Sequence, residues 1–241
     1  MDSNNIILAI TLLLFGFLFN KYFPLFLKKI NYKYFPNSGL LIDNEFSKPQ
    51  AFHERAISVT GGISIYFSYI VAFIYFFFSN QTIYFQYISF CSLFFLLGLI
   101  DDFKINVRPK FRLIAMIMFL VILIINNNFY IEKTGIEFIN RLLEIDIFAL
   151  FFICLCFLFI INGSNLIDGF NGLLGIHSLI IFLNLFFINY LNGIDYLANL
   201  LIYSIIILIP FLVFNFPKAK IFLGDSGSYF LGVFIAISVI K

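Results

Sequence analysis

Long apolar runs recur along almost the whole chain, and they constrain its fold more than any other feature. Hydrophobic residues make up 62% of the 241 residues and charged residues only 12%, whereas a soluble domain is nearer half apolar and a quarter charged. Eight runs are long enough, or nearly so, to cross a hydrocarbon core of roughly 30 Å as helices. They cover residues 6–27, 57–78, 83–100, 111–125, 147–161, 173–191, 197–214 and 229–240. No soluble domain, linker or repeat separates them, so residues 1–241 are predicted to form a single integral membrane domain.

The basic residues are distributed unevenly around these runs. In an eight-span topology, segments 28–55, 101–110, 164–171 and 217–225 share one side of the membrane. Together with the adjoining helix ends, that side holds all but three of the 15 Lys and Arg residues. Loops rich in Lys and Arg remain in the cytoplasm, so both termini are expected outside. On that opposite side, segment 126–146 is expected to form a small hairpin at the membrane surface.

The predicted fold class is therefore all-α: a polytopic membrane protein of about eight transmembrane helices whose polar motifs lie on cytoplasmic loops. The lipid bilayer is its expected surroundings, and no nucleic-acid partner is expected. Four motifs on the basic side carry the functional information.

The first motif is GLIDDFK at 98–104, in which Asp101 and Asp102 directly follow an apolar span. A helix carries partial negative charge at its C-terminus, so two carboxylates there need a cation. Bound Mg²⁺ would serve, as would nearby basic side chains. The candidate basic residues are Lys104, Arg108, Lys110 and Arg112. In the alternative interpretation, the two acids only mark where the membrane ends.

The second motif is NGSNLIDGFNGL at 162–173, a polar loop between two apolar spans. Asn and Gly are common in turns, so an ordinary turn is one interpretation. The loop is, however, longer than a turn needs, and Asn, Ser and Asp alternate with Gly along it. This density of amide and carboxylate groups favours hydrogen bonding to a heterocycle or a sugar.

The third motif runs from Asn215 to Ser228, where Gly-Asp-Ser-Gly-Ser opens the last predicted helix. Backbone N–H groups at a helix N-terminus, flanked by small residues, can bind an anion. Asp225 could instead be a simple helix N-cap. Phe222 offers a ring face for base stacking, although it is one of 37 Phe residues.

The fourth motif is His53-Glu54-Arg55 followed by a Gly-Gly pair at 61–62. His53 and Arg55 could neutralise a phosphate, although basic residues beside a membrane often only set topology. The other histidine, His177, lies inside the sixth predicted span and is interpreted as a buried polar residue.

In this order, the four segments resemble the polyprenyl-phosphate N-acetylhexosamine-1-phosphate transferase family, glycosyltransferase family 4. That superfamily includes the bacterial phospho-MurNAc-pentapeptide translocase. The resemblance rests on GLIDDFK at 98–104, NGSNLIDGFNGL at 162–173 and FPKAKIFLGDSGS at 216–228, with a looser match of HERAISVTGGI at 53–63. It covers residues 45–240. Members of the family transfer a sugar-1-phosphate from a UDP-sugar to a membrane polyprenyl phosphate, release UMP, and use Mg²⁺ or Mn²⁺.

The resemblance implies a role for each matching residue. Asp101 and Asp102 correspond to the catalytic acids, with Asp101 the expected base, and Asp102 and Asp225 correspond to the metal site. The residues expected near the nucleotide or sugar are Asn165, Asp168, Asn171, Asn215 and Phe222, with Phe222 stacking on uracil. A weaker phosphate-binding role is implied for His53, Arg55 and Lys104.

The expected function is transfer of N-acetylhexosamine-1-phosphate, in particular GlcNAc-1-phosphate, from a UDP-sugar to undecaprenyl phosphate, which primes synthesis of a cell-envelope polysaccharide. The enzyme is expected in the bacterial inner membrane with its active site facing the cytoplasm, as a homodimer. Two other functions stay open, namely an inactive truncated binding or assembly subunit and a secondary transporter. Transporters place ion-binding acids near the bilayer midplane, whereas these acids are predicted at span ends.

The chain departs from the family pattern in three places. Ser58 stands where many relatives that prime polysaccharide synthesis have Pro, and Asn171 stands where Asp is commoner. Relatives also carry ten or eleven spans, and their additional part holds a His-rich cytoplasmic loop that contributes to substrate binding. The C-terminal part of the family fold is therefore predicted to be missing.

Overall fold

The computed structural model describes residues 3–34, 39–43, 56–78, 84–105, 107–131 and 133–240. The described residues are largely helical, which confirms the all-α membrane fold. The helices are α1 (Ser3–Tyr34), α2 (Gly61–Phe78), α3 (Tyr84–Asp102), α4 (Pro109–Asn127), α5 (Glu137–Leu143), α6 (Asp146–Ile167), α7 (Leu173–Leu191), α8 (Asp195–Asn215) and α9 (Gly224–Ile240). Each of the eight predicted spans coincides largely with one of these helices. By length and composition, α1, α2, α4, α6, α7 and α8 can cross a membrane, and α9 is a shorter apolar helix.

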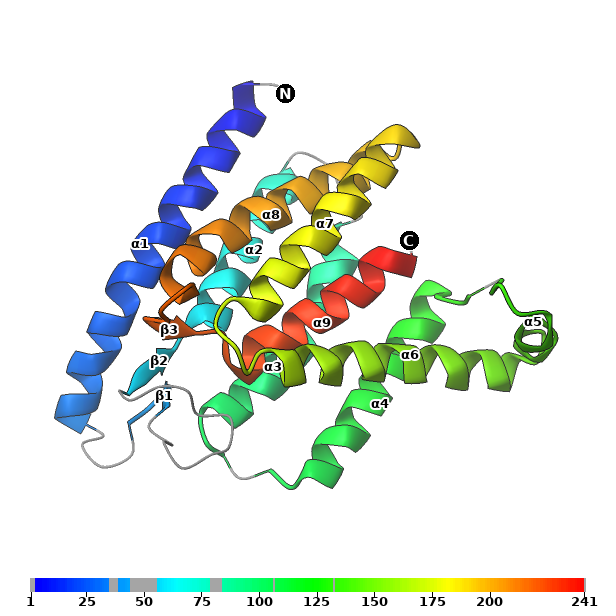
Figure 1. Ribbon diagram of the computed structural model, residues 1–241, viewed down its shortest axis with the longest axis horizontal. Helices are drawn as coiled ribbons and strands as arrows, with labels where there is room; N and C mark the ends of the chain where they lie inside the picture. The colour runs from blue at the N-terminus through cyan, green and yellow to red at the C-terminus, as the bar shows by residue number, and fades with distance from the viewer. Residues whose placement is uncertain are drawn as a thin grey trace.

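Helix α9 is the centre of the bundle (Figure 1). It packs against α2, α3, α6 and α7, and all its residues from Ser226 to Ser238 are buried. It approaches α3 closely at Gly98, where a Cβ atom would lie 2.3 Å from the carbonyl oxygen of Asp225. No side chain fits there, so Gly98 brings the C-terminus of α3 directly onto the N-terminus of α9.

A small sheet lies at the end of the bundle where α9 begins (Figure 1). Its strands are β1 (Ile42–Asp43), β2 (Ile57–Val59) and β3 (Ile221–Phe222). Strand β2 is antiparallel to β1 and parallel to β3. Residues 57–59 were predicted to lie inside a span, and that prediction is wrong. β-Branched Ile57 and Val59 favour extended backbone, and β2 pairs with β3 across the bundle end before α2 begins.

The loops that carry the polar motifs meet at this same end. In Figure 1, α3, α6 and α8 run toward the sheet and α2, α7 and α9 run away from it. The shared side predicted from the basic residues therefore corresponds to one end of the bundle.

Two local expectations are wrong. Segment 126–146 contains the short helix α5 and, among its described residues, no hairpin. Glu137 in the first turn and Arg141 in the last turn of α5 complement the helix dipole, which favours the helix. His177, expected to be buried, is exposed on the outer face of α7, because the buried face of that helix is formed by residues such as Leu174, Ser178 and Phe182.

Candidate active site

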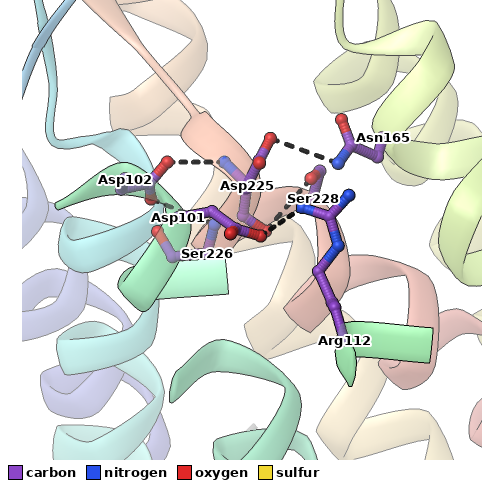
Figure 2. Close-up of polar contacts among 7 residues, drawn as sticks. All are labelled: Asp101, Asp102, Arg112, Asn165, Asp225, Ser226 and Ser228. Carbon is purple, nitrogen blue, oxygen red and sulfur yellow. Dashed lines mark hydrogen bonds and ion pairs between the residues drawn. The ribbon is translucent and has the colours of Figure 1, made fainter. Parts of the chain in front are cut away.

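The carboxylate of Asp102 caps the N-terminus of α9. Its Oδ1 accepts a hydrogen bond from the backbone N–H of Asp225 at 2.8 Å, and its Oδ2 accepts one from Ser226 at 3.0 Å (Figure 2). A carboxylate is favourable there because the first N–H groups of a helix have no partner in their own helix and carry partial positive charge. The sequence predicted an anion site at this terminus, and the anion bound there is a side chain of the same protein. Asp225 is therefore not the N-cap.

Gly224 makes this contact possible. Its φ of +79° lies in the left-handed region, which disfavours other residues. A Cβ atom at this position would lie 2.7 and 2.8 Å from the two carboxylate oxygens of Asp102, and 2.4 Å from a methyl group of Val59. The Gly-Asp-Ser-Gly-Ser motif thus begins with a residue whose missing side chain leaves room for the acid of α3.

The Asp225 side chain points toward the second motif. Its Oδ1 accepts a hydrogen bond from Asn165 Nδ2 at 3.1 Å (Figure 2). The backbone carbonyl of Asp225 accepts a hydrogen bond from the Ser228 hydroxyl at 3.2 Å. Asn165 lies in the last turn of α6, and Asp168 follows directly as the C-cap residue of that helix. Two motifs that are 60 residues apart in the chain are therefore in direct contact.

Asp101 has a different partner from its neighbour Asp102. It forms an ion pair with Arg112 in the first turns of α4 (Figure 2). The Arg112 guanidinium also lies over the ring of Tyr229, with its Cζ 5.9 Å from the ring centroid. Tyr229 is buried in α9. From the sequence, Arg112 was only one of four possible cations and Tyr229 was not predicted at all, because neither residue has a spacing signal that separates it from its neighbours.

The acids at this site influence one another. Burial raises the pKa of Asp168 well above its ordinary value, and the carboxylates of Asp225 and Asp102 raise it further. Burial also raises the pKa of Asp102 to about 7; the negative charge of Asp225 adds to this, whereas hydrogen bonds from Ser226 and from the backbone oppose it. Mutual repulsion of this kind favours a proton or a cation between the carboxylates.

The donor set suits a divalent cation that is completed by substrate. Within the described residues, no three His, Cys, Asp or Glu side chains form a closed metal cage. Mg²⁺ often binds through one or two carboxylates while substrate phosphates and waters supply its other ligands. Asp225 and Asp102 fit that arrangement, since each supplies a carboxylate, which has about four lone-pair sites and can accept hydrogen bonds while it binds a cation.

Asn215 links the second and third motifs through the backbone. Its Oδ1 accepts a hydrogen bond from the Gly172 N–H, and its Nδ2 donates one to the Ile221 carbonyl at 2.8 Å. Asn171 adds a parallel link by donating to the Pro217 carbonyl at 3.2 Å. Both polar groups of the buried Asn215 side chain are thus occupied by the protein. Its expected contact with the nucleotide stays a prediction.

The remaining candidates lie around this centre or outside the described residues. Phe222 is partly buried in β3, paired with Val59 of β2. Lys104 is exposed just after α3, in a left-handed backbone conformation with φ of 57°. His53 and Arg55 lie outside the described residues. Part of their motif is described, however: the Gly62 N–H donates to the Leu223 carbonyl at 2.8 Å, which places the Gly-Gly pair beside the third motif.

The comparisons with known proteins agree with this convergence of motifs. The family model of Glycosyl transferase family 4 matches residues 84–241. The chain belongs to this family. That match includes α3, α6 and α9, the three helices that contribute Asp101, Asp102, Asn165 and Asp225.

Curated relatives carry two kinds of name. An undecaprenyl-phosphate alpha-N-acetylglucosaminyl 1-phosphate transferase of Escherichia coli O157:H7 is 25% identical over 234 residues, which cover 95% of this chain and 61% of the relative. A phospho-N-acetylmuramoyl-pentapeptide-transferase of Dictyoglomus turgidum is 33% identical over 202 residues, which cover 79% of this chain and 61% of the relative. A Thermotoga maritima protein with the same name as the Escherichia coli relative is 28% identical over 191 residues, which cover 76% of this chain and 52% of that relative. The chain thus spans about three fifths or less of the length of these relatives.

Proposed function

We propose that this protein transfers N-acetylhexosamine-1-phosphate, specifically GlcNAc-1-phosphate, from a UDP-sugar to undecaprenyl phosphate and releases UMP. The observation that carries the proposal is the meeting of three distant motifs at the N-terminus of α9, where hydrogen bonds join Asp102, Asp225 and Asn165 and the adjacent Asp101 forms an ion pair with Arg112. Family membership supports the reaction class, and two of the relatives above are named for this transfer to undecaprenyl phosphate.

The two adjacent acids have separate tasks in this proposal. Asp102 is held by two backbone N–H groups and keeps α3 and α9 in register. Asp101 is the base, and Arg112 orients its carboxylate. Asp101 accepts the proton of the lipid phosphate, whose oxygen then attacks the β-phosphorus of the donor. A new P–O bond forms to the lipid phosphate while the bond from the β-phosphorus to the bridging oxygen breaks, and UMP leaves.

Asp225 and Asp102 are the residues proposed to hold Mg²⁺ or Mn²⁺. The bound ion would supply charge neutralisation along the donor diphosphate, which otherwise repels an attacking phosphate. This assignment can be tested without turnover, because a ligand that binds only the folded state raises the unfolding temperature. Mg²⁺ is expected to stabilise the wild type in detergent and to have little effect on Asp225→Asn. An equal shift in both proteins would remove Asp225 from the metal site.

The donor is proposed to lie against the second and third motifs. Asn165, Asp168 and Asn171 supply polar groups for the sugar or base, and Phe222 supplies a ring for uracil, with Asn215 supporting the loop behind them. Lys104, His53 and Arg55 are proposed phosphate contacts. The uneven distribution of Lys and Arg supports a site facing the cytoplasm of a bacterial inner membrane.

One experiment separates this function from the two alternatives. Purified protein is incubated with radiolabelled UDP-GlcNAc, undecaprenyl phosphate and Mg²⁺, and the label is followed into the lipid phase. A transferase moves the label and releases UMP; a binding subunit retains the labelled donor without releasing UMP. A transporter does neither but moves an ion or solute into vesicles. The position of the acids at helix ends disfavours transport, because transporter ion sites lie near the midplane.

A further inference from the structure

Helix α1 carries basic side chains on the face that points away from the bundle. It lies at the outer edge of the bundle and ends beside the sheet (Figure 1). Four exposed lysines occupy an arc of about 140° around its second half, at 3.6 residues per turn: Lys21, Lys28, Lys29 and Lys33. Leu27 and Asn31, on the other side of the helix, are buried. We call the four lysines the α1 basic face.

The length of α1 places this face at a membrane surface. Its 32 residues form a helix of about 48 Å, whereas a hydrocarbon core is about 30 Å thick. A core that begins at Ile6, the first residue of the apolar run, ends near Leu25. Lys28 and Lys29 then lie about 5 Å beyond the core, at the level of the lipid headgroups. Lys21 lies about 6 Å inside the core, and its long side chain can extend to the same level.

The protein supplies little negative charge to the α1 basic face. Residues 3–34 contain no Asp or Glu, and none of the four lysines forms an ion pair with an acid that the structure describes. Residues 44–55, between β1 and β2, hold two Glu, one Lys and one Arg and therefore have no net charge. Two of the lysines lie over rings of their own helix, with Nζ of Lys21 5.2 Å from the centroid of Tyr22 and Nζ of Lys33 5.0 Å from that of Tyr34. The anions that this face needs must therefore come from its surroundings.

We propose that the α1 basic face binds the phosphate headgroups of anionic phospholipids in the leaflet at the sheet end of the bundle. Those headgroups lie at the depth of the ammonium groups, and each Lys beside an anionic membrane surface strengthens binding roughly fivefold. Leu25 and Phe26, which are 61% and 58% exposed between the lysines, face the acyl chains of the same lipids. The face thus matches both parts of an anionic lipid, the charged headgroup and the apolar chain.

Charge separates lipid from the other possible occupants of this face. A second copy in the same membrane has the same orientation and would place lysines against lysines, which repel one another. A further apolar span, such as those expected in longer relatives, would cover the ammonium groups without neutralising them, which is unfavourable. Lipid binding involves none of the residues proposed for catalysis and is measured without turnover. It therefore stands or fails independently of the proposed reaction.

The absence of Trp from the chain allows a single fluorescent probe to report on this face. Leu25→Trp, at the centre of the lysine arc, is made in the full chain, which is reconstituted into vesicles of equal amounts of phosphatidylcholine and phosphatidylglycerol. One lipid at a time carries bromine in its upper acyl chain, which quenches a Trp that it contacts. Brominated phosphatidylglycerol is expected to quench at least about twice as strongly as brominated phosphatidylcholine, since the lysines attract only part of the lipids around the probe. Ile7→Trp is the control, because Ile7 is 59% exposed in α1 near the other membrane boundary and should show no preference.

Replacing the lysines tests whether they cause the preference. In the Leu25→Trp background, quenching by the two lipids should become equal when three members of the face are changed: Lys21→Gln, Lys28→Gln and Lys29→Gln. Screening by 1 M salt, where the Debye length is about 3 Å, should have the same effect. A matched control removes three exposed lysines outside α1 at the same end of the bundle and should keep the preference: Lys110→Gln, Lys218→Gln and Lys220→Gln.

Three results would overturn the proposal. Equal quenching by both lipids with all lysines present would show that the face does not select anionic headgroups. A preference that survives the three substitutions in α1 would show that other residues cause it. Quenching by neither lipid would show that protein, and not lipid, covers this face.

Discussion

The carboxylate of Asp102 accepts a 2.8 Å hydrogen bond from the backbone N–H of Asp225, a residue 123 positions later in the chain. This bond joins the acidic pair of the first motif to the acid of the third. It also separates Asp102 from Asp101, which forms an ion pair with Arg112. Two residues that look equivalent in the sequence therefore have different environments, and the two should respond differently to substitution.

Removing the cap should cost more stability than removing the ion pair. Asp102→Ala leaves two N–H groups of α9 without their partner and is expected to destabilise the protein by about 1–2 kcal/mol, as for other helix caps. Asp101→Ala breaks a partly exposed pair and should cost about 0–1 kcal/mol. Thermal unfolding in detergent measures both. A larger loss in Asp101→Ala would contradict the capping role.

Gly224 should tolerate no side chain. Gly224→Ala places a methyl group against the Asp102 carboxylate in a left-handed backbone conformation, and a destabilisation of about 1–3 kcal/mol is expected. Gly163→Ala is the control, because a Cβ atom there meets nothing within 4 Å and alanine favours a helix by about 0.5–1 kcal/mol. Unfolding midpoints of the two variants should therefore move in opposite directions. Similar shifts would mean that Gly224 has no special role.

Tyr229 is predicted to position Arg112 through its aromatic ring. Tyr229→Phe keeps the ring and should retain transferase activity within about threefold, whereas Tyr229→Leu removes a cation–π contact of roughly 0.5–2 kcal/mol. We expect kcat/KM to fall about tenfold in the leucine variant, which corresponds to about 1.4 kcal/mol. Equal activity of the two variants would show that the ring does not support the site.

Asp168 should make the stability of the metal-free protein depend on pH. Its pKa is raised in the folded state, so the folded protein binds more protons than the unfolded one above about pH 4, the ordinary range of Asp. Stability therefore falls as pH rises toward the folded pKa. Asp168→Asn removes this loss and is expected to raise the unfolding temperature by about 2–4 °C at pH 8, for a gain of about 1 kcal/mol.

The Asp168 comparison is made in the presence of a chelator and repeated at pH 4. There the wild type and Asp168→Asn should unfold at similar temperatures, because Asp168 is largely protonated in the folded protein and partly so in the unfolded one. If the unfolding temperatures of the wild type and Asp168→Asn differed by the same amount at pH 4 and pH 8, Asp168 would not titrate as described.

The helices and the shared side of the motifs were predictable because apolar length and Lys and Arg distribution report directly on membrane insertion. The environment of each acidic side chain could not be predicted from the sequence. Whether Asp102 or Asp225 caps α9 depends on the close approach of α3 at Gly98, a contact that no local pattern encodes. Strand β2 was missed because its three residues continue an apolar run, and hydrophobicity alone does not separate a short strand from the start of a helix.

UMP release by the purified protein is the direct readout of the proposed transfer. With UDP-GlcNAc and undecaprenyl phosphate, the wild type should release UMP only when Mg²⁺ or Mn²⁺ is present. Asp225→Asn should lower the rate about 100-fold or more, the usual effect of losing a preorganised electrostatic contact. Asp195→Asn is the control, since Asp195 is exposed in the first turn of α8, at the opposite end of the bundle, and should keep the wild-type rate. Undiminished UMP release by Asp225→Asn would remove Asp225 from the reaction, and no metal-dependent release by the wild type would show that this protein does not carry out the transfer.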